Sequence, residues 1–133
     1  MKPTFKAQPM QVQVPATSAN LGPGFDCLGL ALNMHDRYMA QVMDEPGVDI
    51  DVTGEGADAV PTTDKNLVIK AMYKGFDFLG GRPRGIALRQ LNVIPHGRGL
   101  GSSAAAIVGG LALARALVLG GNERMSHEDM LNI

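Results

Sequence analysis

The sequence predicts a single domain that contains both β-strands and α-helices. Its 133 residues suffice for one hydrophobic core of moderate size. Three segments alternate apolar and polar residues, as half-buried strands do: Met10–Val14, Val48–Val52 and Gly85–Val93. Two longer segments, Asp64–Gly80 and Ala104–Leu119, carry apolar residues at helical spacing. We therefore expect strands and two main helices to share one core.

The first strands are predicted from alternation and from the residues that interrupt it. Val12 and Val14 alternate with glutamines, and Pro15 ends this strand because proline cannot donate to a sheet. Cys27–Met34 is apolar enough for a buried strand, and we expect Arg37–Met43 to be its hairpin partner.

A turn at Asp44–Gly47 leads to the strand Val48–Val52. Alternation places Asp49 and Asp51 on the same outward face of that strand. Two aspartates so placed resemble a metal pair, but we interpret them as solvated surface charges.

The first predicted helix, Asp64–Gly80, has Asp64 as its expected N-cap and is ended by the glycine pair that begins at Gly80. Its apolar stripe consists of Leu67, Val68, Ala71, Met72, Phe76 and Leu79. In the following strand, Gly85–Val93, we expect Ile86, Leu88 and Leu91 to face the core and Arg89 and Asn92 to face solvent.

The second predicted helix, Ala104–Leu119, is apolar on nearly every face and carries Arg115 as its single charge. It is shorter than the roughly 20 residues that cross a bilayer, so we expect a central helix covered by the sheet and by other helices. Gly109 and Gly110 each cost about 1 kcal/mol relative to alanine in a helix. Such a pair predicts that another element packs against the helix backbone there.

The segment Pro95–Ala106, PHGRGLGSSAAA, has the composition of an anion-binding loop. Its glycines allow close approach of a ligand, and the free N–H groups at the start of the next helix are donors for phosphate oxygens. Arg98 adds a cation to the loop. The segment is not a Walker A loop, because it lacks the lysine, and it is a poor dinucleotide fingerprint. From these residues, a tight turn with Ser102 as an ordinary N-cap is an equal alternative.

A second polar loop, ATSANLGPGFD, follows the first strand. Its side chains suited to ligand contact are Thr17, Ser18, Asn20 and Asp26, of which Asp26 would pair with a cationic amine. The alternative is that Asn20 and Asp26 only stabilise the turn through bonds to the backbone.

Composition narrows the class of protein. A net charge of −1 and two tyrosines, four phenylalanines and no tryptophan argue against nucleic acid and membrane surfaces as partners. The single cysteine, Cys27, excludes an internal disulfide, and the N-terminus lacks a secretory pattern. We expect a cytoplasmic protein with a small-molecule substrate.

Two motifs read together resemble a known family. VPATSANLGPGFDCLGLAL near the N-terminus and NVIPHGRGLGSSAAAIVGGLALA some seventy residues later are similar to segments of the homoserine kinases, a branch of the GHMP kinase family. The resemblance implies an enzyme that uses ATP and Mg²⁺ to phosphorylate the side-chain hydroxyl of L-homoserine in threonine biosynthesis. It also implies an α/β fold of the α+β type, with a mostly antiparallel sheet packed on helices and a left-handed β-α-β unit.

The resemblance also implies roles for individual residues. ATP-binding positions are Asn66, Pro95, His96, Gly97, Arg98, Gly99, Leu100, Gly101, Ser102, Ser103, Ala104 and Ala105. Ser103 would also be a ligand of Mg²⁺, and Asn66 would lie near the adenine. Asn20 and Asp26 match positions that hold the amino-acid substrate. No residue of this chain is expected to act as a catalytic base.

Members of the family are about twice as long as this chain. Residues 1–133 therefore correspond to the N-terminal ATP-binding domain, and Ser126 with Asp129 resembles a capping box at the start of a further helix. In the family, a glutamate in a later E-G-H-P-D-N segment completes the Mg²⁺ site. We expect the parent protein to be the kinase, a homodimer to be compatible with it, and this segment to have little activity without the remainder. The alternatives are another GHMP kinase, acting on shikimate or mevalonate, and a non-catalytic nucleotide-binding module.

Overall fold

The computed structural model describes residues 3–15, 35–54, 57, 60–92, 102–126 and 128–129. In chain order, its elements are β1 (Met10–Pro15), β2 (His35–Met43), β3 (Gly47–Gly54), α2 (Leu67–Phe78), β4 (Gly85–Asn92), α3 (Ser102–Leu117) and α4 (Gly121–Arg124).

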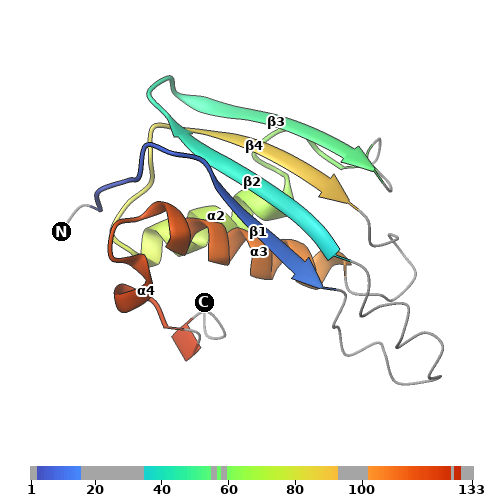
Figure 1. Ribbon diagram of the computed structural model, residues 1–133. Helices are drawn as coiled ribbons and strands as arrows, with labels where there is room; N and C mark the ends of the chain where they lie inside the picture. Colours follow the sequence, from blue (N-terminus) through green and yellow to red (C-terminus); the bar gives the residue numbers. More distant parts are fainter. Residues whose placement is uncertain are drawn as a thin grey trace.

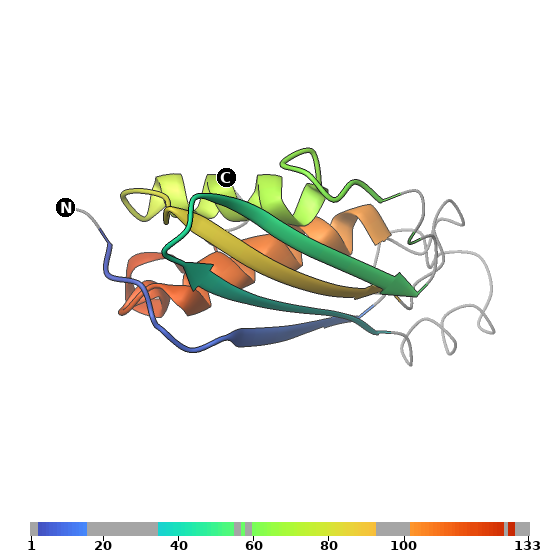
Figure 2. The same ribbon diagram turned by 90° about the horizontal axis from the view of Figure 1, so that it is seen from above.

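The strands form one sheet in the order β1-β2-β4-β3, with both long helices on one of its faces (Figures 1 and 2). β1 pairs with β2 and β2 with β4 in antiparallel fashion, whereas β3 and β4 are parallel. The expected α/β fold with a mostly antiparallel sheet is confirmed. In Figure 1, β3 and β4 point the same way, β4 lies below β3, and α2 lies behind the sheet, so the β3-α2-β4 connection is left-handed.

Of two predictions about the first strands, the one about the turn before β3 is confirmed, and the other concerns residues outside the described part. The turn before β3 occurs where DEPG predicts it, and its Gly47 takes a φ of 105°, which glycine adopts without strain. The proposed hairpin partner of β2, Cys27–Met34, lies outside the described residues. Within the described part, the neighbours of β2 are β1 and β4.

Helix α2 begins later than the sequence predicts. Asp64 lies in a turn, and the N-cap is Asn66, whose side chain accepts hydrogen bonds from the backbone N–H groups of Val68 and Ile69. The prediction of Asp64 was wrong because the chain makes one further turn first, closed by the bond from the Asn66 N–H to the Thr63 carbonyl. At the other end, the expected stop at Gly80 is confirmed by its φ of 114°.

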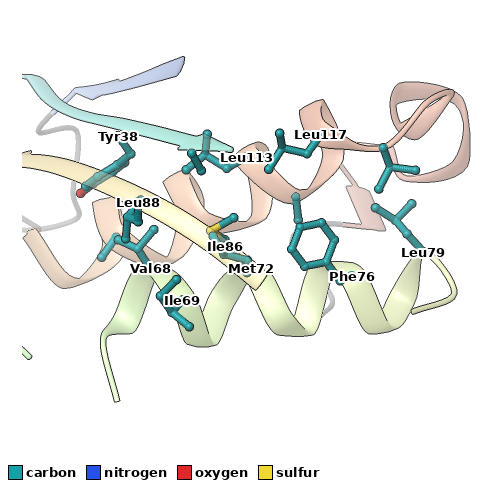
Figure 3. Close-up of a cluster of buried hydrophobic side chains, with 14 of the residues drawn as sticks. Tyr38, Val68, Ile69, Met72, Phe76, Leu79, Ile86, Leu88, Leu113 and Leu117 are labelled. Atoms are coloured by element: carbon teal, nitrogen blue, oxygen red, sulfur yellow. The ribbon is translucent and has the colours of Figure 1, made fainter. Parts of the chain in front are cut away.

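The core lies between the helix layer and the sheet (Figure 3). The largest side chains that are almost completely buried include Tyr38, Ile69, Met72, Phe76, Ile86, Leu88, Leu113 and Leu117. All of the predicted α2 stripe is buried except Leu67, which is 43% exposed. One apolar stripe on each helix therefore packs against the inward face of the sheet.

Helix α3 spans Ser102–Leu117, and its two glycines make the close contacts that the sequence predicts. A Cβ atom at Gly109 would collide with the ring of Tyr38 on β2. One at Gly110 would lie 2.5 Å from the Val68 carbonyl oxygen of α2. Glycine here brings α3 close to its neighbours on two sides, which confirms the prediction.

The expectation that α3 is buried on nearly every face was wrong. Ile107 and Val108 are 47% and 49% exposed. The described residues form two layers, and they leave these two side chains of α3 about half uncovered. The expected capping box after α4 is confirmed: the Ser126 N–H donates to Asp129 Oδ2, and the Asp129 N–H donates to Ser126 Oγ.

In β4 the prediction was right for Ile86 and Leu88 and wrong at the C-terminal end. Leu91 is 38% exposed, whereas Asn92 is 2% exposed and faces the helices. Strict alternation explains the result, because Asn92 lies an even number of residues from Ile86 and Leu88. The position of Asn92 in the alternation, and not its polarity, decides which way it faces.

Candidate functional site

The two loops with the predicted site residues, Thr17–Asp26 and Pro95–Gly101, lie outside the described residues. The elements that flank these loops are described. β1 ends at Pro15, which pairs with His35 at the start of β2. β4 runs antiparallel to β2, so its last residue, Asn92, lies at the same end of the sheet. The topology therefore brings the origins of both loops to one end of the sheet, which we call the loop end.

The first turn of α3 also lies at the loop end, because the helix follows β4. Ser102 to Ala105 are helical, and the N–H groups of a first turn lack acceptors within their own helix. Ala105 is 3% exposed and belongs to the core, and its role in ATP binding stays a prediction. A helix of this length presents the positive end of its dipole there, which favours an anion.

Buried polar side chains gather at the loop end. Among the described residues, those classed as buried and polar or charged are Asp36, Asn66, Gln90 and Asn92. Gln90 and Asn92 are the buried residues among the last three of β4, and Asp36 is the second residue of β2. The rest of the core is apolar, and this concentration of buried polar groups makes the loop end the candidate site.

Asn66 is completely buried and uses both ends of its amide. Its Oδ1 accepts from the N–H groups of Val68 at 2.8 Å and Ile69 at 3.3 Å. Its Nδ2 donates to the Pro61 carbonyl at 3.0 Å and to Gln90 Oε1 at 3.1 Å. The expected place of Asn66 near the adenine stays a prediction, and such a contact through the side chain would require one of these bonds to open.

Asp36 and Tyr38 form a buried pair that the sequence reasoning missed. The Tyr38 hydroxyl donates to Asp36 Oδ2 at 3.1 Å, and their side chains are 0% and 1% exposed. Burial raises the pKa of Tyr38 well above its ordinary value, and the charge of Asp36 and the hydrogen bond to it act in the same direction. Asp36 would have been found by extending the alternation of β2 back by one residue, since it shares the inward face with Tyr38 and Ala40.

This pair predicts a pH dependence that can be measured. The pKa of Tyr38 is higher in the folded state than in the unfolded state, where it is about 10. The neutral Tyr38 hydroxyl therefore contributes fully to the free energy of unfolding below about pH 10, and this contribution decreases above that pH. Tyr38→Phe should remove part of this alkaline loss and cost about 1–2 kcal/mol at pH 7, since Asp36 loses a hydrogen bond. Urea unfolding from pH 7 to 11 tests it, with Tyr73→Phe as control; an unchanged alkaline slope in Tyr38→Phe would contradict the assignment.

Ser103 is the residue predicted to bind a metal ion. Ser103 lies in the first turn of α3. Within the described ranges there is no group of three or more His, Cys, Asp or Glu side chains that could hold a metal. The role of Ser103 as a ligand of Mg²⁺ stays a prediction. None of the described helices is long and apolar enough to cross a bilayer.

Comparison with known proteins identifies the family of the chain. The family described as GHMP kinases N terminal domain matches residues 66–133, and the chain belongs to the GHMP kinases. Among curated proteins it is similar to homoserine kinase of Streptomyces coelicolor, with 49% identity over 98% of this chain and 42% of the relative. It is also similar to homoserine kinase of Cutibacterium acnes, with 56% identity over 81% of this chain and 37% of the relative.

Solved structures agree with this family. The crystal structure of homoserine kinase from Cytophaga hutchinsonii matches with a TM-score of 0.68 and 29% identity, over 97% of this chain and 40% of that chain. A mevalonate diphosphate decarboxylase from Legionella pneumophila matches with a TM-score of 0.55 at 12% identity, over 87% of this chain and 40% of that chain, and shows the fold only. The chain spans 42% of the length of its Streptomyces coelicolor relative.

Proposed function

We propose that this chain is the ATP-binding part of a kinase that transfers the γ-phosphoryl group of ATP to the side-chain hydroxyl of L-homoserine. The observation that carries the proposal is 49% identity to a homoserine kinase over 98% of the chain, which includes both loops. The product is O-phospho-L-homoserine, an intermediate of threonine biosynthesis. The cytoplasm as location and a homodimer as assembly belong to the same proposal.

In this proposal the loop end binds both substrates. The backbone of Pro95–Ala105 holds the phosphates, with the first turn of α3 providing N–H donors. Asp26 pairs with the ammonium group of homoserine, and Thr17, Ser18 and Asn20 orient the rest of the amino acid. These contacts place the acceptor hydroxyl beside the γ-phosphate, and most of the barrier to phosphoryl transfer is overcome by such positioning.

Mg²⁺, when bound to the phosphates, neutralises their charge. Ser103 is the residue of this chain that we propose as a ligand, and the resemblance implies that further ligands come from the remainder of the parent protein. The chain's own contribution is electrostatic: α3 directs its N–H dipoles at the phosphates, and Arg98 adds a positive charge. We assign no catalytic base to these residues.

The test is ADP release by the complete gene product with Mg-ATP and, separately, L-homoserine, shikimate, mevalonate and L-serine. Release that depends on L-homoserine supports the proposal. Release with another alcohol would contradict the substrate assignment while keeping the kinase. ATP binding without turnover on any alcohol would instead indicate a nucleotide-binding module. Residues 1–133, assayed in parallel, should release ADP at least about tenfold more slowly because they include only part of the catalytic groups.

A further inference from the structure

Three buried amide side chains form a continuous chain between α2 and the end of β4. Asn66 Nδ2 donates to Gln90 Oε1 at 3.1 Å, and Gln90 Nε2 donates to Asn92 Oδ1 at 2.9 Å. Their side chains are 0%, 5% and 2% exposed, respectively. The N-cap of α2 is thereby connected to the last residue of β4, three positions before the glycine-rich loop begins at Pro95.

The direction of this chain is set by helix α2. Because Asn66 Oδ1 must accept from the helix N–H groups, its NH₂ group faces the sheet and donates to Gln90. Gln90 then has its oxygen toward Asn66 and its NH₂ toward Asn92. Asn92 in turn has its oxygen toward Gln90, so its NH₂ group is the donor at the far end of the three hydrogen-bonded amides. The cap of α2 therefore determines which way the last amide of β4 faces.

The stability of the core does not by itself require buried amides at these positions. Burying an amide costs free energy that its hydrogen bonds only offset, and apolar side chains of the same shape are often as stable. The inward residues of β4 before Gln90 are Ile86 and Leu88, which are apolar. The change to amides occurs only in the last part of the strand, at the loop end. A role in orienting groups at that end explains the pattern better than stability does.

We propose that Gln90 and Asn92 are positioning residues for phosphoryl transfer. Through them the N-cap of α2 holds the Asn92 NH₂ as a fixed donor where β4 continues into the phosphate-binding loop. This inference rests on the proposed function, since its effect is on the use of ATP. Gln90 and Asn92 act through the loop, and neither is a catalytic residue.

Two nearly isosteric variants of the complete protein test the role of this hydrogen-bonded chain of amides. In Asn92→Asp, the carboxylate still accepts from Gln90 but the donor at the far end is lost. In Gln90→Glu, the carboxylate still accepts from Asn66 but cannot donate to Asn92. We expect kcat/KM for ATP to fall about ten- to a hundredfold in both. Gln13→Glu, the same change on the exposed face of β1, should leave kcat/KM within about twofold.

A destabilised control variant distinguishes a positioning role of Gln90 and Asn92 from a purely structural one. Phe76→Leu lowers the stability of the same core far from the loop end, and should reduce Tm while leaving kcat/KM of the folded protein within about twofold. If Asn92→Asp and Gln90→Glu behave like Phe76→Leu, with a lower Tm and normal kcat/KM, the proposal is overturned.

Failure of the proposed function is a separate outcome. If the complete protein phosphorylates no alcohol, the homoserine kinase assignment fails, and the amide chain is then judged by the affinity for ATP. A loss of affinity of about tenfold or more in both variants, with Gln13→Glu unchanged, supports positioning of the phosphate loop. Affinities equal to that of the parent protein overturn it.

Discussion

Asn66→Ala is expected to lower the free energy of unfolding by about 3 kcal/mol. Loss of the N-cap bonds to the backbone of α2 costs about 1 kcal/mol. The substitution also leaves Gln90 Oε1 and the Pro61 carbonyl without their donor, and an unsatisfied buried group costs about 1–3 kcal/mol. The second contribution is the larger, because Asn66 is completely buried. Urea unfolding of the complete protein measures the loss.

Two control variants separate these contributions. Asn66→Ser keeps a capping oxygen and loses the amide donors, so it should recover about 1 kcal/mol of the loss. Asp64→Ala removes the residue that local sequence favours as the cap, and should change the free energy of unfolding by less than about 0.5 kcal/mol. Equal losses in Asp64→Ala and Asn66→Ala would show that the cap is not the one described.

Gly110→Ala is expected to cost about 2 kcal/mol, although alanine is the better helix former. The new methyl group would lie 2.5 Å from the Val68 carbonyl oxygen and 2.6 Å from the Ala71 Cβ. Both neighbours belong to α2, and a backbone oxygen moves only if the helix moves. Overpacking of this kind costs about 1–3 kcal/mol, whereas the gain in helix propensity is about 1 kcal/mol. We expect the upper part of the overpacking range because the neighbour is backbone.

The measurement is again urea unfolding, with Val108→Ala as the matched control on the same helix. Val108 is 49% exposed, so its substitution should change the free energy of unfolding by less than about 0.5 kcal/mol. Gly110→Ala combined with Ala71→Gly should keep most of the loss, since the contact with the Val68 oxygen remains and the new glycine weakens α2 by about 1 kcal/mol. A stabilised Gly110→Ala variant would mean that α2 and α3 are further apart than described.

Most elements follow from local pattern. Alternation predicted β3 and most of β4, and glycines predicted where α2 ends and where α3 meets its neighbours. These predictions succeeded because side-chain alternation and the low steric demand of glycine are properties of a few consecutive residues. The start of α2 was missed because Asp64 and Asn66 are both good caps, and the choice depends on the contacts that Asn66 makes with Pro61 and Gln90.

In the candidate site, too, some features follow from local sequence and others do not. The glycine-rich loop and the polar N-terminal loop were identified from their own residues, and their ligand contacts stay predictions. The buried groups behind them were not identified, since polar side chains such as Asp36, Gln90 and Asn92 are ordinarily expected at the surface. Each has a buried hydrogen-bond partner: Asp36 accepts from Tyr38 two residues along β2, Asn92 accepts from Gln90 two residues along β4, and Gln90 accepts from Asn66 at the start of α2.

Local sequence therefore predicts the type of most described segments and the two loops proposed to bind the substrates. It does not specify which strands are neighbours, the hand of the β3-α2-β4 connection, or the amide chain that joins α2 to β4. Those features arise from contacts between residues as far apart as Asn66 and Gln90, whose free energy exists only when the segments pack together. The candidate site residues are predicted from the order of residues along the chain, whereas the buried polar groups beside them follow from the packing of helix on sheet.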